Sequence, residues 1–505
     1  MISRVITAAV KGMSGVRIMV ETDIARGLPA MTVVGLGDAA VKESRERIRS
    51  AVTSSGYTFP GMRITVNLSP AYIRKRGSHF DLAIAMGILS ASGQVFDRKL
   101  AETAFIGELS LGGDVRGCSG ILPMIAELRR NGVKGVVIPE ENVREAALFD
   151  DIDVYPVKSL SEAADVANLV REAEAREPVS HEYLCRNSDG ETADFGDVKG
   201  QEQAKRAITV AVAGGHGLLM TGSPATGKTM LASRIPGIMM PMDREELMET
   251  AAIYSAAGLL GKDRPFASGR PFRCPGTAIS KAGLIGGGYP PVPGEITLAH
   301  RGVLFLDEVG EYERDVIEAL RIPLEKKEIS LIRRGEKFVF PADCLLVAAT
   351  NPCKCGYYGD GTDRCTCTED EVRRYRGRLS GPVLDRIDMH IYLNPVNYED
   401  LGDKNTVTSD MMREKVERAW IAQKRRYDGT GIRLNGGLDE AGACEFCSAG
   451  EDGEELLKNA YERLKLNPRT LFKVRKIART IADIDGAENV EAYHVAEALQ
   501  YRERE

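Results

Sequence analysis

The first third of the chain alternates short apolar runs with stretches of helical periodicity. Runs rich in β-branched residues predict strands, and apolar residues spaced three and four positions apart predict helices. Strands are expected at 16–20, 31–34, 63–67 and 135–138, and the clearest helices at 38–54 and 120–131. This alternation predicts an α/β domain over residues 1–170.

The pattern changes twice further along the chain. Residues 171–193 are highly charged, carry no apolar period over a full helix and predict a linker. Residues 194–395 contain apolar runs typical of buried strands and predict a second α/β domain. Residues 396–505 show only helical patterning, so we expect an all-helical third domain with helices at 408–426, 453–465, 469–483 and 490–501.

One loop of the second domain has the spacing of a phosphate-binding loop. It follows the apolar run 217–221 and has the form G-x-x-x-x-G-K-[ST], with glycines that let backbone N–H groups turn toward phosphates. The N-terminus of the next helix adds its positive end. We expect this loop to bind a nucleoside triphosphate, most simply ATP, through Gly222, Ser223, Pro224, Ala225, Thr226, Gly227, Lys228 and Thr229.

A second strand of this domain ends in two carboxylates. The run Val303 to Leu306 is apolar throughout, and Asp307 and Glu308 follow it. Because ligands bind at the carboxyl ends of strands in an open α/β sheet, we expect both motifs to meet there. Lys228 is then expected to reach the β- and γ-phosphates, Thr229 and Asp307 to hold Mg²⁺, and Glu308 to polarise the attacking water. The pair of motifs predicts an ATPase.

Two further polar residues follow strand-like segments of the second domain. Asn351 ends the apolar run 345–350, where it could orient the water at the γ-phosphate, or simply form a turn before Pro352. Arg386 lies in Leu-Asp-Arg-Ile-Asp. An arginine supplied across a subunit boundary stabilises charge on a transferring phosphate, whereas an isolated arginine is more often a surface ion-pair residue.

Composition limits the class of protein. The chain has 505 residues, a formal net charge of −6, 43% hydrophobic and 28% charged residues, and ten cysteines. These values are ordinary for a globular protein and argue against coating of nucleic acid by the whole surface, although a local basic channel stays possible. We expect a cytoplasmic protein in a reduced compartment, with no membrane partner.

Four cysteines cluster directly after Asn351, in the order Cys353, Cys355, Cys365 and Cys367. Paired thiols on a loop of Gly, Asp and Thr suit a tetrahedral, structural Zn²⁺ site, although C-x-C is tighter than the usual spacing. The alternative is a flexible loop with four free thiols. Both interpretations stay open from the sequence.

A basic turn between two β-type runs predicts a hairpin over residues 329–340. Arg333, Arg334 and Lys337 lie at this turn. The residues alone favour an ordinary solvated basic turn. In a ring, six copies would line a channel with positive charge that suits a phosphate backbone.

Taken together, these motifs resemble the AAA+ ATPase core, an α/β fold with a parallel sheet and a helical lid. The chain resembles the ComM/YifB family of magnesium-chelatase-like ATPases over nearly its whole length. The resemblance is most specific in the sequences Arg270-Pro-Phe-Arg273, 293–300, 302–308 and Leu379-Ser-Gly-Pro382. The resemblance implies a hexameric ring with ATP between neighbours and Arg386 acting in trans. It also implies that Arg469 reaches the γ-phosphate from the same chain, and that the segment Val198 to Gln201 packs near the adenine.

ComM-like proteins act as ATP-driven DNA motors that migrate branched recombination intermediates during uptake and integration of foreign DNA. The resemblance therefore implies DNA in the ring pore, contacted by the hairpin, with branch migration or helicase activity. Two departures stand out. Relatives carry Pro-His-His-Thr where this chain has Pro275 to Ala278, in an insert expected to be mobile, and Ser-x-Arg where it has Asn467-Pro-Arg469.

The N-terminal domain is similar to the Lon protease proteolytic domain in the stretches 107–115 and 132–142. In that family a Ser nucleophile and a Lys base are required, but this chain has His79 and Leu122 at those positions. We therefore expect an inactive, Lon-like scaffold. Two other functions stay open for the whole chain, a magnesium-chelatase-type metal-insertion ATPase and a protein-remodelling ATPase.

Overall fold

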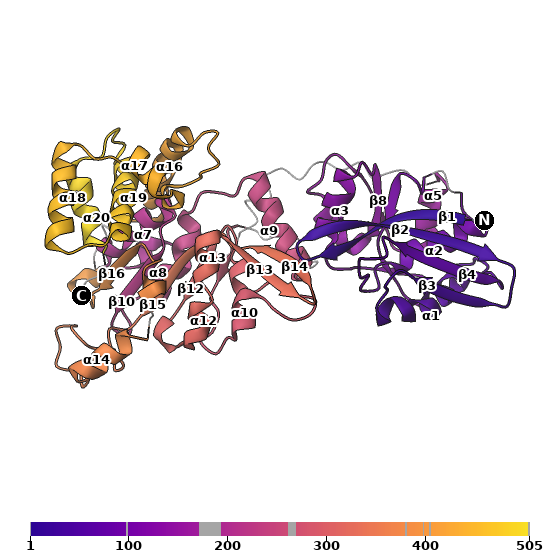
Figure 1. Cartoon of the computed structure of the whole chain (residues 1–505), viewed down its shortest axis with the longest axis horizontal. Coiled ribbons are helices and arrows are strands. Elements are labelled where there is room, and N and C mark those ends of the chain that lie inside the picture. The colour runs from indigo at the N-terminus through magenta and orange to yellow at the C-terminus, as the bar shows by residue number, and fades with distance from the viewer. Residues whose placement is uncertain are drawn as a thin grey trace. The chain divides into compact units, whose positions relative to one another are not determined.

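A computed structural model describes residues 2–96, 99–170, 193–260, 269–378, 381–396, 398–402 and 406–502. The described residues form two compact units, which Figure 1 colours by residue number. Residues up to 170 together with 244–260 make the first unit, and residues 193–243 together with 269–502 make the second. The predicted linker, apart from Ala193, lies outside the described residues.

The first unit is built on a mixed seven-stranded sheet in the order β3-β4-β2-β1-β5-β8-β9. The pairs β1–β2 and β2–β4 are antiparallel, and the other neighbours are parallel. The strands are β1 (Ile2–Lys11), β2 (Ser14–Ala25), β3 (Ala30–Val34), β4 (Arg63–Ser69), β5 (Thr103–Phe105), β8 (Gly135–Pro139) and β9 (Asp153–Val157), with a small hairpin of β6 (Glu108–Leu109) and β7 (Val115–Arg116). The predicted α/β class of this domain is confirmed.

The helices of this unit are α1 (Ala39–Ser54), α2 (Asp81–Ala91), α3 (Ile121–Arg130), α4 (Val143–Ala146) and α5 (Leu160–Ala167). The predicted α1 and α3 are confirmed. The sequence did not predict α2, because every one of its residues is buried and no polar face marks a helical period. It likewise missed β1, whose central residues are almost all buried.

Helix α9 (Arg244–Ala256) also belongs to the first unit, although it follows the phosphate loop in sequence. The backbone N–H of Gly120, just before α3, donates to the carbonyl of Ser255 at 2.9 Å. The Ser255 hydroxyl donates to the buried carboxyl of Glu145 at 2.8 Å, and burial raises the pKa of that carboxyl above its ordinary value. A segment from beyond the linker therefore completes the N-terminal core.

The second unit contains a five-stranded sheet in which every pairing is parallel. Its order is β11 (Phe272–Arg273), β12 (Val303–Leu306), β15 (Leu345–Thr350), β10 (Leu218–Gly222) and β16 (Met389–Leu393). The three central strands are apolar and buried, as expected for a parallel sheet covered on both faces. Since they run in the same direction, the loops after β10, β12 and β15 meet at one edge, and the predicted parallel α/β core is confirmed.

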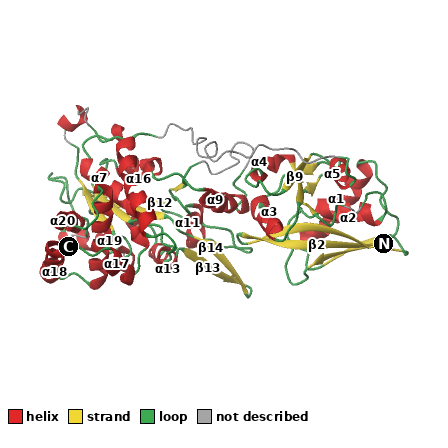
Figure 2. Ribbon diagram, turned by 90° about the horizontal axis from the view of Figure 1, so that it is seen from above, coloured by secondary structure: helices red, strands yellow, loops and turns green. Residues whose placement is uncertain are grey.

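The C-terminal region is helical, as predicted. Figure 2 shows α17 to α20 gathered near the C-terminus. The helices are α16 (Ser409–Arg426), α17 (Glu440–Phe446), α18 (Glu451–Arg463), α19 (Pro468–Asp485) and α20 (Ala492–Gln500). The Asn467 side chain accepts from the Thr470 N–H at 2.8 Å, so Asn467 caps the N-terminus of α19. Of these five helices, the sequence did not predict α17, because its seven residues are too few to show a clear helical period of apolar residues.

Smaller elements complete the second unit. They are α7 (Glu202–Gly214), α8 (Lys228–Arg234), α10 (Lys281–Ile285), α11 (Glu295–Leu298), α12 (Arg314–Glu318), α13 (Arg321–Lys326), α14 (Glu369–Arg376), α15 (Gly381–Leu384) and the hairpin of β13 (Glu328–Arg333) and β14 (Glu336–Pro341). The glycine-rich insert, expected to be mobile, includes α10, α11 and a turn in which Gly287 and Val292 exchange backbone hydrogen bonds. No helix in the described ranges is long and apolar enough to cross a membrane.

Candidate functional site

The phosphate loop joins β10 to α8 and is closed by its own lysine. Lys228 Nζ donates to the carbonyls of Gly222 at 2.6 Å and Ser223 at 3.0 Å. Ala225 and Gly227 have φ of 65° and 86°, the left-handed conformation that turns backbone groups inward. Burial lowers the pKa of Lys228, and the charges of Asp307 and Glu308 oppose that shift. The phosphate loop is therefore held in shape around the ammonium group of Lys228.

The carboxylates after β12 face this loop. Thr229 Oγ1 donates to Asp307 Oδ2 at 2.7 Å, which places a hydroxyl and a carboxylate together, the oxygen ligands that Mg²⁺ prefers. Glu308 is exposed and has φ of 49°, an uncommon conformation for a residue with a side chain. Such strain concentrates at functional sites. The donor set therefore fits a magnesium–triphosphate group.

Asn351 completes this cluster from the third strand. Its Oδ1 accepts from Lys228 Nζ at 3.1 Å, so the side chains after β10, β12 and β15 converge as the sheet order requires. Buried Gln201 also contacts the loop and donates to the carbonyls of Asn394 at 2.9 Å and Thr226 at 3.4 Å. Val198, three residues earlier, is also buried.

Arg386 and Arg469 belong to a second group of charges. Arg386 has 8% of its side chain exposed and donates to Glu325 Oε2 of α13 at 2.8 Å, whereas Glu325 is 60% exposed. This bond, together with the charge of exposed Arg469 at the start of α19, lowers the pKa of Glu325. No motif marks Glu325, because its hydrogen bond depends on a partner 61 residues away.

The predicted hairpin is present, with Arg333 opposite Glu336 across a turn of Arg334 and Gly335. Both turn residues have positive φ, 50° and 81°, as two-residue hairpin turns favour. One face of the hairpin is buried, and the other is exposed. Exposed side chains are Glu328, Ser330, Ile332, Arg333, Arg334, Lys337 and Val339. The Arg334 guanidinium also lies 4.2 Å from the centre of the Tyr289 ring.

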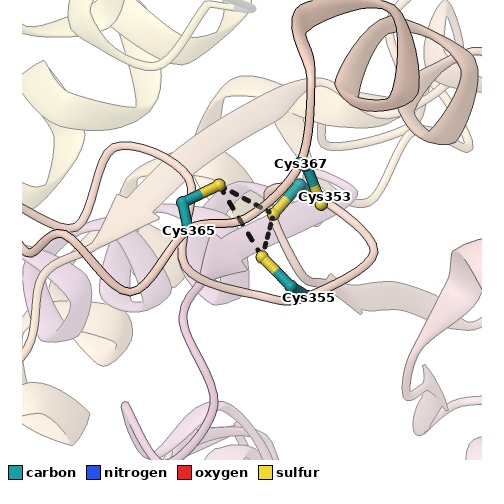
Figure 3. A group of neighbouring side chains, drawn as sticks. All are labelled: Cys353, Cys355, Cys365 and Cys367. Carbon is teal, nitrogen blue, oxygen red and sulfur yellow. Dashed lines mark hydrogen bonds between the residues drawn. The ribbon is translucent and has the colours of Figure 1, made fainter.

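The four clustered cysteines converge on one point. Their sulfur atoms all lie within 4.8 Å of one another, and Figure 3 shows them approaching from two parts of the same loop. The distance between Sγ atoms is 3.3 Å for Cys353–Cys355, 3.9 Å for Cys353–Cys365 and 3.7 Å for Cys355–Cys365. These residues could hold a metal ion.

The Lon-like positions of the first unit form a different kind of group. Ser78, the residue before His79, donates to Glu108. His79 is partly buried, and desolvation lowers its pKa to about 4. Leu122, at the position of the protease base, is buried. Its backbone N–H donates to the Ser255 hydroxyl of α9 at 3.3 Å. These positions hold no serine–lysine pair.

Comparison with known proteins assigns the family. The model "Magnesium chelatase, subunit ChlI" matches residues 194–401, "Subunit ChlI of Mg-chelatase" matches 20–142, and the ChlI C-terminal model matches 406–502. The chain is 39% identical to competence protein ComM of Haemophilus influenzae and 38% identical to YifB of Escherichia coli, each over 99% of this chain and 97% of the relative. The chain belongs to the YifB/ComM family of magnesium-chelatase-like proteins.

The N-terminal region of this family member also resembles Lon protease distantly. It is 33% identical to Lon protease 2 of Bacillus subtilis over 127 residues, which cover 25% of this chain and 22% of that protein. The AAA+ domain implies an ATPase that uses ATP and Mg²⁺, and proteins of this class are typically oligomeric. The converging groups around Lys228 agree with that activity.

Proposed function

We propose that the chain forms a hexameric ring that couples ATP hydrolysis to the movement of DNA, and that it promotes branch migration in homologous recombination or natural transformation. The observation that carries this proposal is the hairpin of β13 and β14, which presents three cations at and beside an exposed turn. The 39% identity to a competence protein supports the same direction.

The exposed hairpin face combines charge with apolar surface. Lys337 is paired across the strands with Ile332, of which 67% is exposed, and Val339 lies further along the same face. Cations attract the phosphate backbone without regard to sequence, and apolar side chains can rest on sugars and bases. A motor that acts on branched DNA requires this kind of sequence-independent contact.

Within the ATP site, Lys228 binds the β- and γ-phosphates, Thr229 and Asp307 hold Mg²⁺, and the residues Val198 and Gln201 pack near the adenine. Bound Mg²⁺ neutralises charge that develops on the phosphates. Glu308 orients the attacking water, and Asn351, hydrogen bonded to Lys228, fixes its line of approach. Arg469 acts from the same chain.

Arg386 acts on the triphosphate of the neighbouring chain. Within one chain, the carboxylate of Glu325 accepts a hydrogen bond from this guanidinium. Glu325 is 60% exposed, so its carboxylate can turn into solvent and release the guanidinium. We propose that in the assembled ring the triphosphate bound by the neighbouring chain replaces Glu325 as the acceptor for the Arg386 guanidinium. Before assembly, Glu325 would hold Arg386 in place.

The first unit is proposed to be a scaffold without peptidase activity, since buried Leu122 stands where the protease has its lysine base and His79 stands where it has its serine nucleophile. The model matched by residues 20–142 carries the chelatase subunit's name, so the N-terminal region alone does not separate a DNA motor from a metal-insertion ATPase. The substrate decides between them. A structural Zn²⁺ at the cysteine cluster is part of the same proposal.

The test replaces Arg333, Arg334 and Lys337 together by alanine. We expect ATP hydrolysis without DNA to be unchanged, while stimulation by branched DNA and branch migration are lost. The matched control replaces Lys458, Arg463 and Lys465, three exposed basic residues of the helical lid, and removes the same charge. It should behave like the unchanged chain.

Unchanged branch migration in the hairpin variant would falsify the assigned DNA contact. If branched DNA never stimulates the unchanged chain, but a chelatase partner or unfolded protein does, the DNA function itself is wrong. The same ATPase assay over a panel of effectors therefore separates the three function classes.

A further inference from the structure

The cysteine cluster is close to the geometry of a metal site. A zinc ion bound by four thiolates at about 2.3 Å requires sulfur atoms roughly 3.8 Å apart at the corners of a tetrahedron. The three sulfur–sulfur distances given above run from 3.3 to 3.9 Å. All four sulfur atoms fall within 4.8 Å of each other.

The loop that carries these cysteines, residues 353–367, is long and forms no helix or strand. It starts two residues after Asn351 and ends at Thr368, whose side chain and Glu371 form a capping box on α14. Loops of this length without their own secondary structure are uncommon in compact domains, and those that occur are usually functional or disordered. A metal bound by four of its side chains would close this loop on itself and order it.

The same loop touches the phosphate loop. Gly356, next to Cys355, has φ of +89°, and a Cβ at this position would lie 2.7 Å from Pro224 Cδ and 2.8 Å from Pro224 Cγ. Pro224 is the third residue of the phosphate loop, and its ring cannot rotate away. The Gly356 N–H donates to the carbonyl of Cys353 at 3.0 Å, so the first cysteine pair sets the turn that makes this contact.

We infer that the four cysteines form a zinc brace, residues 353–367, that holds Gly356 against Pro224 and thereby keeps the phosphate loop in its nucleotide-binding shape. The brace fastens two elements of the ATP site at once, since Asn351 lies two residues before it and accepts a hydrogen bond from Lys228. This inference rests on the proposed zinc and ATPase roles and is independent of DNA.

The first arm of the test measures metal. The purified full chain, expressed with zinc available, is expected to contain one zinc per chain by elemental analysis. Cys365→Ser should lose that zinc, and it should weaken binding of a fluorescent ADP analogue by about 5- to 100-fold, the usual range for coupling between two sites. Cys444→Ser, which changes an exposed cysteine of α17, should alter neither quantity.

The second arm separates the contact from the metal. Gly356→Ala should retain zinc and still weaken nucleotide binding, because the added methyl group pushes Pro224 away. Gly359→Ala is the matched control, since Gly359 also has positive φ, +75°, but nothing within 4 Å of an added Cβ. Any strain from the left-handed backbone is common to both variants.

Three results would overturn the inference. They are a purified chain without zinc, a Cys365→Ser chain that binds the ADP analogue normally, and equal nucleotide affinities for Gly356→Ala and Gly359→Ala. None of these measurements contains DNA. A failed brace and a failed DNA motor are therefore distinguished.

Discussion

Two glycine-containing loops, residues 75–81 of the first unit and 222–229 of the second, differ in what their polar groups face. In the second loop, Thr229 is exposed and hydrogen bonded to Asp307, and several groups converge on one side. In the first, Asp81 is buried and paired with Arg47 at 2.9 Å. A buried charge that is paired inside the protein, such as Asp81, stabilises the fold. Polar groups that converge at the surface, such as Thr229 and Asp307, can exchange their hydrogen bond to each other for contacts with a ligand.

The largest expected effect tests this difference directly. Lys228→Ala should reduce ATP hydrolysis to background, since the cation that faces the phosphates is removed. Ser78→Ala, in the other loop, should leave ATP hydrolysis unchanged. Neither this variant nor the unchanged chain should cleave peptides. Steady-state ATPase and peptidase assays on both variants check this. Peptide cleavage that depends on Ser78 would contradict the assignment of the first unit as a scaffold.

Arg386 sharpens the comparison because its side chain is only 8% exposed, yet it is proposed to act in catalysis. Arg386→Ala should lower the rate of hydrolysis by roughly 10³-fold or more, the contribution usual for an arginine finger, with little change in ADP affinity. Glu325→Gln should leave hydrolysis in the assembled ring close to normal. Single-turnover ATPase measurements decide the matter. Normal turnover by Arg386→Ala would show that this ion pair is only structural.

The smallest effect concerns the buried pair of Asp81 and Arg47. Desolvation raises the pKa of Asp81 to about 6, although Arg47 opposes that shift. The stability gained from the neutral carboxyl is complete below the unfolded pKa and is lost as pH rises through about 6. Asp81→Asn cannot ionise, so its unfolding temperature should rise relative to that of the unchanged chain between pH 4 and 7.

Thermal unfolding of both chains over this pH range gives the measurement. Partly buried His79 contributes the opposite slope, because its lowered pKa removes stability as pH falls. That contribution is common to both chains and cancels in the difference. A difference in unfolding temperature that is independent of pH would mean that Asp81 keeps an ordinary pKa.

The sequence predicted the elements whose boundaries have a local cause. The apolar runs of β10, β12 and β15 stop at polar residues, and strand order then brings Lys228, Asp307 and Asn351 together. The lid helices were likewise predicted from their amphipathic period. What the sequence could not provide are partners chosen by tertiary folding. Glu325 beside Arg386 and Pro224 beside Gly356 belong to no motif, and fully buried α2 has no polar face.

The place of α9 has a practical consequence for anyone who divides this protein. A fragment that begins at residue 194 still carries α9 but lacks Gly120 and Glu145, the groups that satisfy Ser255. A fragment that stops at residue 170 keeps those groups and loses the helix. Either cut uncovers an internal surface, so the obvious boundary between the halves is a poor place to separate them.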